Sequence, residues 1–256
     1  MNTRSEISGG SISSRPEIHS KHFFFGYPYG APEKNDMIIR SIYALSSNDE
    51  TKFADWVCYR LDPITLGNPR ASSRRWVANP WLAPEETLEP DDYRDAKRAL
   101  NADRGYFAPL SSFRGSLDND DVNMLSNISP QSSNLNQGPW ARVEQEVRAT
   151  VAGGQTLWVM TGPFYEDEMP ALPRADEEHL VPSGYWKIVA SGSRNDPSTA
   201  TAVAFIFDQD TDRNADPSEH IRTVDEVEVR TGLDFFWELP EDIESQLEST
   251  VGSWPI

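Results

Sequence analysis

The sequence predicts an α+β or layered α/β/α fold, because strand-length apolar segments alternate with isolated amphipathic helices. Hydrophobic residues make up 38% of the 256 residues, which excludes a chain too polar to form a core. There is no internal repeat and no linker long enough to separate two domains. We therefore expect one domain over residues 23–256, preceded by a Ser-rich disordered arm over residues 1–22.

Four strands are predicted from short runs rich in aromatic and β-branched residues, each bounded by turn-forming residues. They are Ala54–Tyr59, Leu157–Thr161, Trp186–Ala190 and Thr201–Phe207. The last run is almost continuously apolar, which is typical of a strand that is buried on both faces. These runs would supply the central strands of the sheet.

A helix is predicted to begin at Pro139, because proline fits the first helical turn, where its missing N–H would have no partner anyway. Apolar side chains then recur at helical intervals: Trp140, Val143, Val147 and Val151. Glu144 and Arg148 stand four residues apart on another face, in the order that favours an ion pair.

Two further helices are predicted towards the C-terminus. Thr223 and Glu226 have the spacing of a capping box, and Gly232 marks the end of that helix. Pro240 precedes a short amphipathic stretch, so a last helix is expected there. Together with the helix at Pro139, these segments would supply the helical layers.

The composition excludes several classes of protein. No apolar run approaches the roughly 18 residues that a membrane-spanning helix needs. The N-terminal arm lacks the apolar stretch of a secretory signal, so we expect no signal peptide, and no ligand role for His19 or His22. Cys58 is the single cysteine, which excludes an intramolecular disulfide and a Cys-based zinc site.

The formal net charge of −18 argues at first against a nucleic-acid partner, since polyanions are usually bound by basic proteins. The charge is unevenly spread, however. Residues 205–256 carry 14 acidic residues against 3 arginines, whereas residues 68–148 carry 12 acidic against 10 basic residues. A locally basic cleft in the middle of the chain is therefore compatible with the net charge.

The middle of the chain is dense in Asn, Arg and Gly, and predicts polar loops that lead into the helix at Pro139. Asparagine offers a neutral oxygen ligand, which suits hard cations such as Mg²⁺. Asn136 could cap this helix, bind a metal, or do both, and its residue type alone favours the cap. Arg104 beside Gly105 could contact a phosphate, although a lone arginine more often forms a surface ion pair.

From Phe25 to Leu247 the sequence resembles the sugar-nonspecific DNA/RNA endonucleases of the ββα-metal class, and most closely their Serratia type. An ordered set of motifs carries the resemblance: Thr51–Val57, Arg74–Trp76, Asp103–Gly105, Leu125–Gln131, Leu135–Arg142, Thr161–Pro163, Val181–Lys187, Phe207–Gln209 and Thr223–Glu226. The resemblance implies a central antiparallel sheet layered with helices, and a ββα finger that holds the site. It also implies Mg²⁺-dependent hydrolysis of phosphodiester bonds in both DNA and RNA, with Mn²⁺ as an alternative ion.

The same resemblance assigns roles to individual residues. Asn136 would be the one protein ligand of a hydrated Mg²⁺, and Glu144, two helical turns further on, would orient metal-bound waters. Arg74 would clamp the scissile phosphate. Two further arginines would support the substrate or the metal shell by their charge: Arg104 and Arg148. Four polar residues match positions that line the family's site: Asp103, Asn123, Asn127 and Gln131.

One residue departs from the family's Asp-Arg-Gly-His motif, because Tyr106 stands where the general-base histidine belongs. Histidine has an ordinary pKa of about 6.5, whereas that of tyrosine is about 10, so only about one phenol in a thousand is ionised at pH 7. A nearby Mg²⁺ and Arg104 would lower the pKa of the phenol. Neither His179 nor His220 has a sequence reason to reach the site.

Three interpretations stay open. Tyr106 could act as base or position water in an enzyme that works best at alkaline pH. The site could instead be impaired, binding metal and nucleic acid without efficient turnover, or the chain could be a structural protein on a nuclease fold. Retention of the other site residues argues against the last: Arg74, Asn136, Glu144 and Arg148. A homodimer, secretion or periplasmic location would follow only from the resemblance, and non-classical export or an intracellular inhibitor are alternatives.

Overall fold

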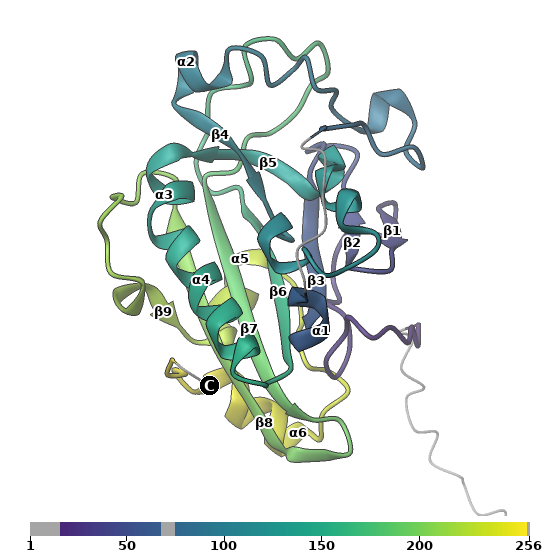
Figure 1. Ribbon diagram of the computed structural model, residues 1–256, viewed down its shortest axis with the longest axis vertical. Coiled ribbons are helices and arrows are strands. Elements are labelled where there is room, and N and C mark those ends of the chain that lie inside the picture. The colour runs from purple at the N-terminus through teal and green to yellow at the C-terminus, as the bar shows by residue number, and fades with distance from the viewer. Residues whose placement is uncertain (1–15, 68–74, 255–256) are drawn as a thin grey trace, which may run out of the picture.

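The fold is built on one antiparallel sheet. The structure is a computed structural model that describes residues 16–67 and 75–254. Within these residues the sheet has seven strands in the order β1-β2-β3-β6-β7-β8-β9 (Figure 1). Their bounds are Asp36–Ile39 (β1), Ala44–Ser47 (β2), Ala54–Leu61 (β3), Leu157–Phe164 (β6), Gly184–Ser193 (β7), Asp196–Asp208 (β8) and Ile221–Arg222 (β9). All four predicted strands lie in this sheet, so their prediction is confirmed.

A separate hairpin carries the central polar segment of the chain. Strands β4 (Ala102–Tyr106) and β5 (Ile128–Ser132) pair antiparallel, with Asp103 opposite Gln131. The chain passes directly from β5 into α3 (Ser133–Gln137) and α4 (Pro139–Ala152). Two strands followed by a helix form the expected ββα finger, which lies at one end of the sheet (Figure 1).

The remaining helices are short. The α-helices are Pro63–Leu66 (α1), Ala96–Leu100 (α2), Val224–Thr231 (α5) and Glu241–Ser249 (α6). Single 3₁₀ turns span Pro84–Glu86, Leu110–Ser112, Asn119–Asn123, Leu125–Asn127 and Pro217–His220. In the described residues no helix is long and apolar enough to cross a membrane.

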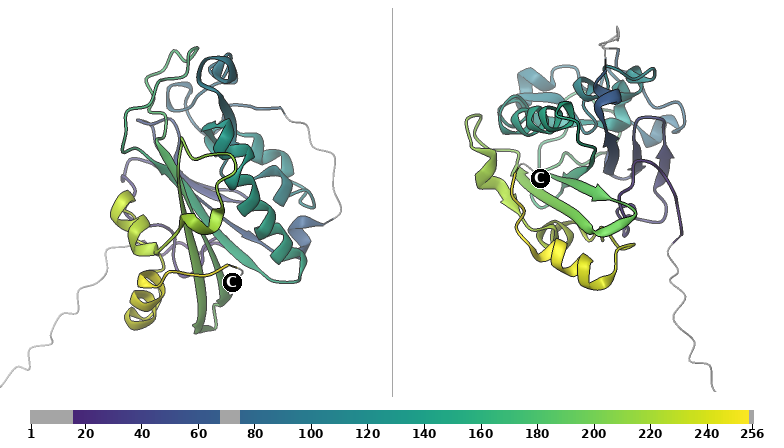
Figure 2. Two further views of the ribbon diagram at one scale, coloured as in Figure 1. Left: turned by 90° about the vertical axis from the view of Figure 1, so that its left-hand side faces the viewer. Right: turned by 60° about the horizontal axis from the view of Figure 1, so that its bottom comes forward.

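The sheet is covered on both faces. Along β3, Val57 and Tyr59 pack into the cluster that contains the apolar face of α4. The alternate residues Trp56 and Cys58 pack into a second cluster with α5, α6 and the segment around Phe24. Figure 2 shows α4 on one side of the sheet and the yellow C-terminal helices on the other. This alternation follows from the two-residue period of a strand and produces the α/β/α layering.

The predicted helix boundaries are confirmed at three points. Helix α4 begins at Pro139, and all four apolar residues predicted to face the core are buried. The Thr223 hydroxyl accepts a hydrogen bond from the Glu226 amide at 3.1 Å, and Gly232 ends α5 in the left-handed conformation at φ 73°. Helix α6 follows Pro240.

Residues 16–22, the described part of the expected arm, lie against the domain, whereas residues 1–15 of that prediction lie outside the described residues. His22 is 2% exposed, and its Nε2–H donates to the carbonyl of Arg40 at 3.0 Å. Trp158 donates its indole N–H to the carbonyl of Lys21, and Tyr27 donates its hydroxyl to the carbonyl of Pro16. The polar composition of this segment misled the prediction, because its backbone carbonyls, not its side chains, make most of the contacts.

Candidate active site

A pocket of about 470 Å³ opens beside the ββα finger, between β4, α2, α4 and the loop that follows β4. Five residues predicted for the site line it: Asp103, Arg104, Tyr106, Asn136 and Glu144. The hairpin β4–β5 supplies the first three and the helices α3 and α4 supply the other two. The structure therefore brings half of the predicted residues into one cavity.

Asn136 does not cap the helix at Pro139, and the interpretation that its residue type favoured was wrong. It lies inside α3, and the residue at the N-cap position of α4 is Gly138, which has no side chain to offer. A Cβ at Gly138 would approach backbone oxygens of Asn134 and Arg213 to 2.4 and 2.5 Å, so only glycine fits between the helices. The break at Gly138 gives α3 its own direction and leaves Asn136 at the pocket wall.

Asp103 organises the floor of the pocket. Its carboxylate accepts hydrogen bonds from the Gln137 amide at 2.7 Å, the Ser133 hydroxyl at 2.8 Å and the Asn136 amide at 3.2 Å. The Lys97 ammonium lies 3.2 Å from the same carboxylate. Burial alone would raise the pKa of Asp103, but these hydrogen bonds hold it below its usual value.

The contact with Asp103 decides which atom Asn136 presents to the pocket. A carboxylate with a lowered pKa only accepts hydrogen bonds, so the Asn136 amide places its nitrogen against Asp103. The amide oxygen Oδ1 is then the atom left for the cavity. A neutral oxygen held in place by a carboxylate behind it fits a hard divalent cation.

Glu144 lies on α4 with its side chain 15% exposed and facing the same pocket. The Arg148 guanidinium lies 3.9 Å from it, at the outer limit of an ion pair, and does not line the pocket. Burial raises the pKa of the Glu144 carboxyl, whereas the positive charges of Lys187 and Arg148 act in the opposite direction. The neighbouring cations therefore favour the ionised form of this carboxyl against the effect of burial.

Lys187, which the sequence reasoning missed, acts on Glu144 from the core without lining the pocket. It lies in β7, is 1% exposed, and its ammonium lies 4.1 Å from the centroid of the Trp140 ring. Its Nζ makes no hydrogen bond to the described residues. Burial lowers the pKa of Lys187 to about 8, although the charge of Glu144 opposes this. The signal in the sequence was a lone lysine inside an apolar strand, within one of the motifs that match the family.

Arg104 is held by aromatic rings and not by a carboxylate. Its guanidinium lies 4.3 Å from the ring centroid of Trp76 and 5.1 Å from that of Tyr93, and it donates to the carbonyl of Pro90 at 3.1 Å. Within the described chain Arg104 forms no ion pair, so its positive charge is not neutralised by a neighbouring acid. An arginine fixed in this way is suited to a phosphate.

The Tyr106 hydroxyl is fixed by two hydrogen bonds. The indole N–H of Trp76 donates to it at 2.8 Å, and the hydroxyl donates to Oδ1 of Asn123 at 3.0 Å. Asn123 is 1% exposed and does not line the pocket, and it contacts the pocket residue Tyr106. Trp76, which the sequence reasoning did not select, lines the pocket and contacts both Arg104 and Tyr106.

Besides Arg148 and Asn123, two further predicted residues do not line the pocket. Asn127 is fully buried: its side chain accepts from the Ala108 amide at 2.9 Å and donates to the carbonyls of Ala108 and Val122. Gln131 is 1% exposed and packs against Gly105, where a Cβ would approach it to 2.6 Å. Both residues shape the backbone around β4, and their assignment as site-lining residues is corrected accordingly.

Three other residues were considered from the sequence: Arg74, His179 and His220. Arg74, predicted to clamp the phosphate, lies outside the described residues. The ring of His179 accepts from the Leu172 amide at 3.0 Å, and that of His220 contacts the carbonyl of Ile206 at 3.2 Å. Neither histidine lines the pocket, so neither replaces the missing imidazole.

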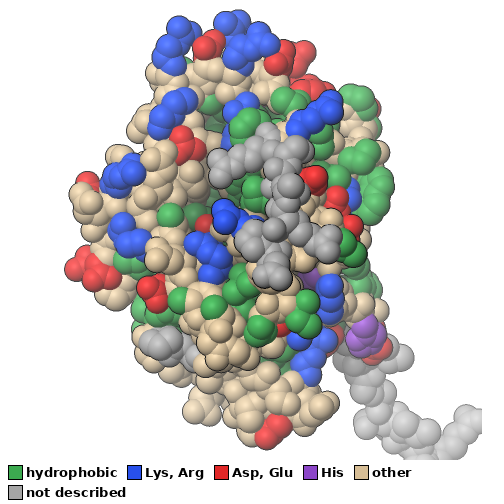
Figure 3. All heavy atoms as spheres, viewed as in Figure 1, with side chains coloured by type: hydrophobic (Ala, Val, Ile, Leu, Met, Phe, Trp, Pro, Cys, Tyr) green, Lys and Arg blue, Asp and Glu red, His purple; other side chains and the backbone are tan. Residues whose placement is uncertain are grey.

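The pocket is locally basic although the molecule is acidic. Lys97, Arg104 and Arg114 line it, against the carboxylates of Asp103 and Glu144. Figure 3 shows Lys and Arg side chains spread across the face that carries α2, α4 and the β4–β5 hairpin. The local balance of charge is therefore compatible with an anionic ligand, as the uneven charge of the sequence predicted.

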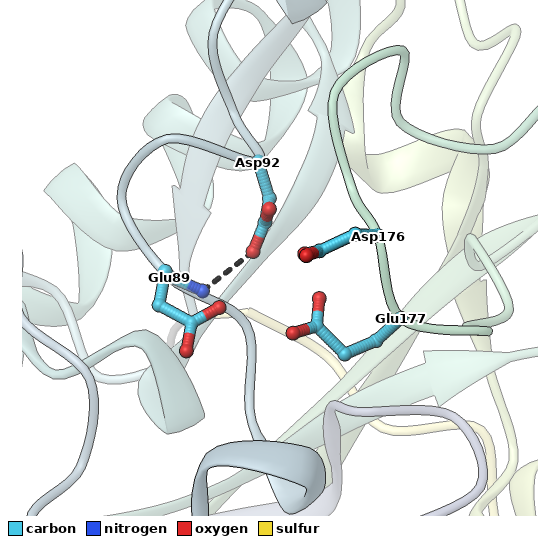
Figure 4. A group of neighbouring side chains, drawn as sticks. All are labelled: Glu89, Asp92, Asp176 and Glu177. Atoms are coloured by element: carbon cyan, nitrogen blue, oxygen red, sulfur yellow. Dashed lines mark hydrogen bonds between the residues drawn. The ribbon is translucent and has the colours of Figure 1, made fainter.

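A group of four carboxylates lies outside this pocket lining, between the loop before α2 and the segment before β7: Glu89, Asp92, Asp176 and Glu177 (Figure 4). Asp92 accepts a hydrogen bond from the Glu89 amide at 2.6 Å. Burial, followed by the charges of Glu177 and Asp92, raises the pKa of Glu89 to about 7.

The layered antiparallel sheet and the ββα finger that carries the pocket define the fold of a ββα-metal nuclease. The chain belongs to the DNA/RNA non-specific endonuclease family, whose model matches residues 22–242. The fold and the family that the sequence predicted are therefore confirmed.

Individual relatives agree with this assignment. The chain is 42% identical to a nuclease of Serratia marcescens over 90% of this chain and 85% of that protein. It is 28% identical to a nuclease of the cyanobacterium Nostoc sp. over 91% of this chain and 86% of that protein. A chain in the crystal structure of the EndoG/EndoGI complex has a similar fold, with a TM-score of 0.70 at 20% identity, and the match covers 84% of this chain and 90% of that chain.

Proposed function

We propose that this protein hydrolyses phosphodiester bonds of both DNA and RNA with Mg²⁺, or alternatively Mn²⁺, and that Tyr106 takes the place of the usual general-base histidine. The observation that carries the proposal is the shared pocket, in which Asn136, Glu144 and Tyr106 surround one cavity beside Arg104. Membership of the DNA/RNA non-specific endonuclease family supports the reaction class.

The amide oxygen of Asn136 would hold the cation, because its nitrogen is engaged by Asp103. A bound divalent cation would supply Lewis-acid stabilisation to the leaving oxygen. Glu144 would orient the waters around the site, and Arg104, stacked between aromatic rings, would bind a phosphate oxygen. Arg148 would act through its ion pair with Glu144.

Tyr106 would accept the proton of the attacking water in its phenolate form. Trp76 and Asn123 fix the hydroxyl at the pocket wall, which orients the oxygen for this step. The hydroxyl proton that is hydrogen-bonded to Asn123 must be lost before the phenolate forms. We therefore propose that the cleavage rate rises with pH.

In this scheme Asn136, Glu144, Arg104 and Tyr106 would act on phosphate, metal or water, and the scheme assigns no residue to the edge of a base. Contacts to the phosphate backbone carry no sequence information. The same site would therefore cut DNA and RNA without sequence preference.

The direct test is digestion of plasmid DNA and of RNA in Mg²⁺, in Mn²⁺ and in EDTA, with Asn136→Ala and a matched control, Asn134→Ala. Asn134 lies on the same helix but is exposed and does not line the pocket. We expect metal-dependent cleavage of both substrates by the wild type and by Asn134→Ala, and a loss of at least about 100-fold in Asn136→Ala.

The second candidate function, metal and nucleic-acid binding without efficient turnover, is favoured by the donated hydrogen bond from Tyr106 to Asn123. It predicts that the wild type retains labelled DNA in a metal-dependent way but releases no cleaved product. Cleavage that persists at full rate in Asn136→Ala would contradict both functions as they are placed here.

A further inference from the structure

Three carboxylates converge where α5 packs against α6, on the face of the sheet opposite to α4. They belong to Asp225 and Glu228 of α5 and to Glu248 of α6, and one oxygen of each lies within 4.8 Å of the others. None of the three lines the candidate active site. The two helices lie side by side behind the sheet, where Figure 2 shows them in yellow and yellow-green.

Glu248 is buried in this group. The residue is 7% exposed, and its carboxyl oxygen Oε1 has no hydrogen-bond partner in the described part of the chain. Burial and the neighbouring charges of Glu228, Glu244, Asp225 and Asp234 raise the pKa of Glu248 to about 9. A buried carboxylate without a partner is costly, so this position points to a positively charged ligand or to a bound proton.

The arginines nearest in sequence, Arg222 of β9 and Arg230 of α5, are engaged elsewhere. Arg222 pairs with Glu226 at 3.6 Å, and Arg230 pairs with Glu166 on a different segment. Among the described residues, no ion pair involves Asp225, Glu228 or Glu248. Glu228 also accepts a hydrogen bond from the Phe235 amide at 2.9 Å, which fixes one of its oxygens. The described residues therefore supply no ion pair that would neutralise the group.

We propose that Asp225, Glu228 and Glu248 bind a hard divalent cation of the calcium class between α5 and α6. Calcium takes carboxylate oxygens at about 2.3–2.6 Å, so two oxygens across one ion lie up to about 5 Å apart, which the observed spacing allows. Magnesium demands shorter bonds and retains most of its waters, which a site of several carboxylates around a buried one suits less well. The cation would join the two helices and would act on stability, independently of the proposed nuclease function.

Thermal unfolding of the whole protein tests this site. The wild type is compared with Glu248→Gln and with Asp242→Asn, which removes an exposed charge from the same helix outside the group. Each is measured in EDTA, in CaCl₂, in MgCl₂ and in NaCl of matched ionic strength. At calcium near 100 times Kd we expect Tm of the wild type and of Asp242→Asn to rise by about 5–10 °C.

The Tm of Glu248→Gln should differ from that of the wild type both in EDTA and in calcium. In EDTA near neutral pH its Tm should exceed that of the wild type, because glutamine does not have to take up a proton when the chain folds, as a buried carboxyl with a raised pKa does. In calcium it should gain no more than it gains in matched NaCl. Asn136→Ala should keep the full calcium response, which separates this site from the candidate active site.

Two results would overturn the proposal. One is a wild-type Tm that rises no more in calcium than in matched NaCl, which would mean that Glu248 shares a proton and takes no cation. The other is a calcium response in Glu248→Gln and in Asp225→Asn that is as large as that of the wild type, since each variant should lose a ligand. Isothermal titration with CaCl₂ gives the same comparison at constant temperature, so a loss of folding in one variant would not hide the outcome.

Discussion

At the residue scale, the chemistry of the pocket is decided by which atom each polar side chain turns towards the cavity. Asp103 accepts a hydrogen bond from the amide nitrogen of Asn136, which leaves the amide oxygen of Asn136 free to face a cation. The Tyr106 hydroxyl donates a hydrogen bond to Oδ1 of Asn123, and Trp76 donates one to the same hydroxyl oxygen. The residue types alone could not reveal these orientations, because asparagine and tyrosine can both donate and accept.

Asp103→Asn tests the orientation of Asn136. The new amide can donate as well as accept, so it no longer requires the Asn136 nitrogen to face residue 103. We therefore expect the affinity for the metal to fall by about 10–100-fold. Titration with Mn²⁺ measures this, with Asp91→Asn as a control that removes an exposed charge. Unchanged affinity in Asp103→Asn would mean that the amide is oriented by other contacts.

Lys187→Met tests the support of Glu144 from inside the core. Removing the buried cation takes away a charge that lowers the pKa of Glu144, so that pKa should rise further. If cleavage needs the Glu144 carboxylate, the acidic limb of the pH–rate profile should move to higher pH. The same substitution in a Glu144→Gln background should leave the limb unchanged, and a shift that persists there would contradict the account.

At the element scale, the sequence predicted the parts of the fold that depend on local pattern. The apolar period of α4, the turn residues around the strands and the caps of α5 all agree with the structure. The sequence could not predict the break at Gly138, because it depends on the close approach of the backbone at Arg213. That break is the reason that Asn136 lies in α3 and is not a cap.

The same limit explains the candidate site residues that were misplaced. Asn127 and Gln131 lie in motifs that match the family, but a motif does not say on which side of a strand or turn a side chain points. The structure turns both inwards, against Ala108 and Gly105. Lys187 is the opposite case, since its strand was predicted but its approach to Glu144 required the packing of α4 on β7.

Asn127→Ala tests the structural role of this residue. The substitution leaves buried backbone groups of Ala108 and Val122 without their partner, so we expect the free energy of unfolding to fall by at least about 1–3 kcal/mol. Urea unfolding measures this, and Asn134→Ala serves as the exposed control. A large loss of cleavage with unchanged stability would instead restore Asn127 as a residue of the site.

At the scale of the whole molecule, the negative charge is a cost to stability and is kept away from the pocket. Three carboxyls have pKa values well above their usual range: Glu89 and Glu228 at about 7 and Glu248 at about 9. In each, burial is the first cause and neighbouring acids add to it. The folded protein therefore holds protons that the unfolded chain releases near pH 4.5.

These values predict how stability depends on pH. Between its unfolded and its folded pKa, a carboxyl with a raised pKa binds a proton in the folded state but not in the unfolded state, so the free energy of unfolding falls as pH rises. In EDTA we therefore expect stability to fall between about pH 6.5 and 8. His22, with a pKa of about 4, has no further effect above pH 6.5, and Lys187, at about 8, acts only above that window. Each group contributes at most about 1.4 kcal/mol per pH unit, measurable by urea unfolding.

Glu248→Gln should flatten this decline, because Glu248 has the highest pKa of the three. Stability that rises between pH 6.5 and 8 would contradict the assignment of these groups. Added NaCl should raise stability at pH 8, since it screens the repulsion between acidic side chains.

The central claim is that Tyr106 stands in the position of the general base, and the pH profile of DNA cleavage tests it most directly when the wild type is compared with Tyr106→His and Tyr106→Phe. We expect the wild-type rate to rise by up to about tenfold per pH unit between pH 7 and 9, and Tyr106→Phe to lose this rise. Tyr106→His should exceed the wild type by roughly 100- to 1000-fold at pH 7 and level off above the pKa of imidazole. A wild-type profile that is flat from pH 6 to 9, or a Tyr106→His variant that is no faster at pH 7, would contradict the account.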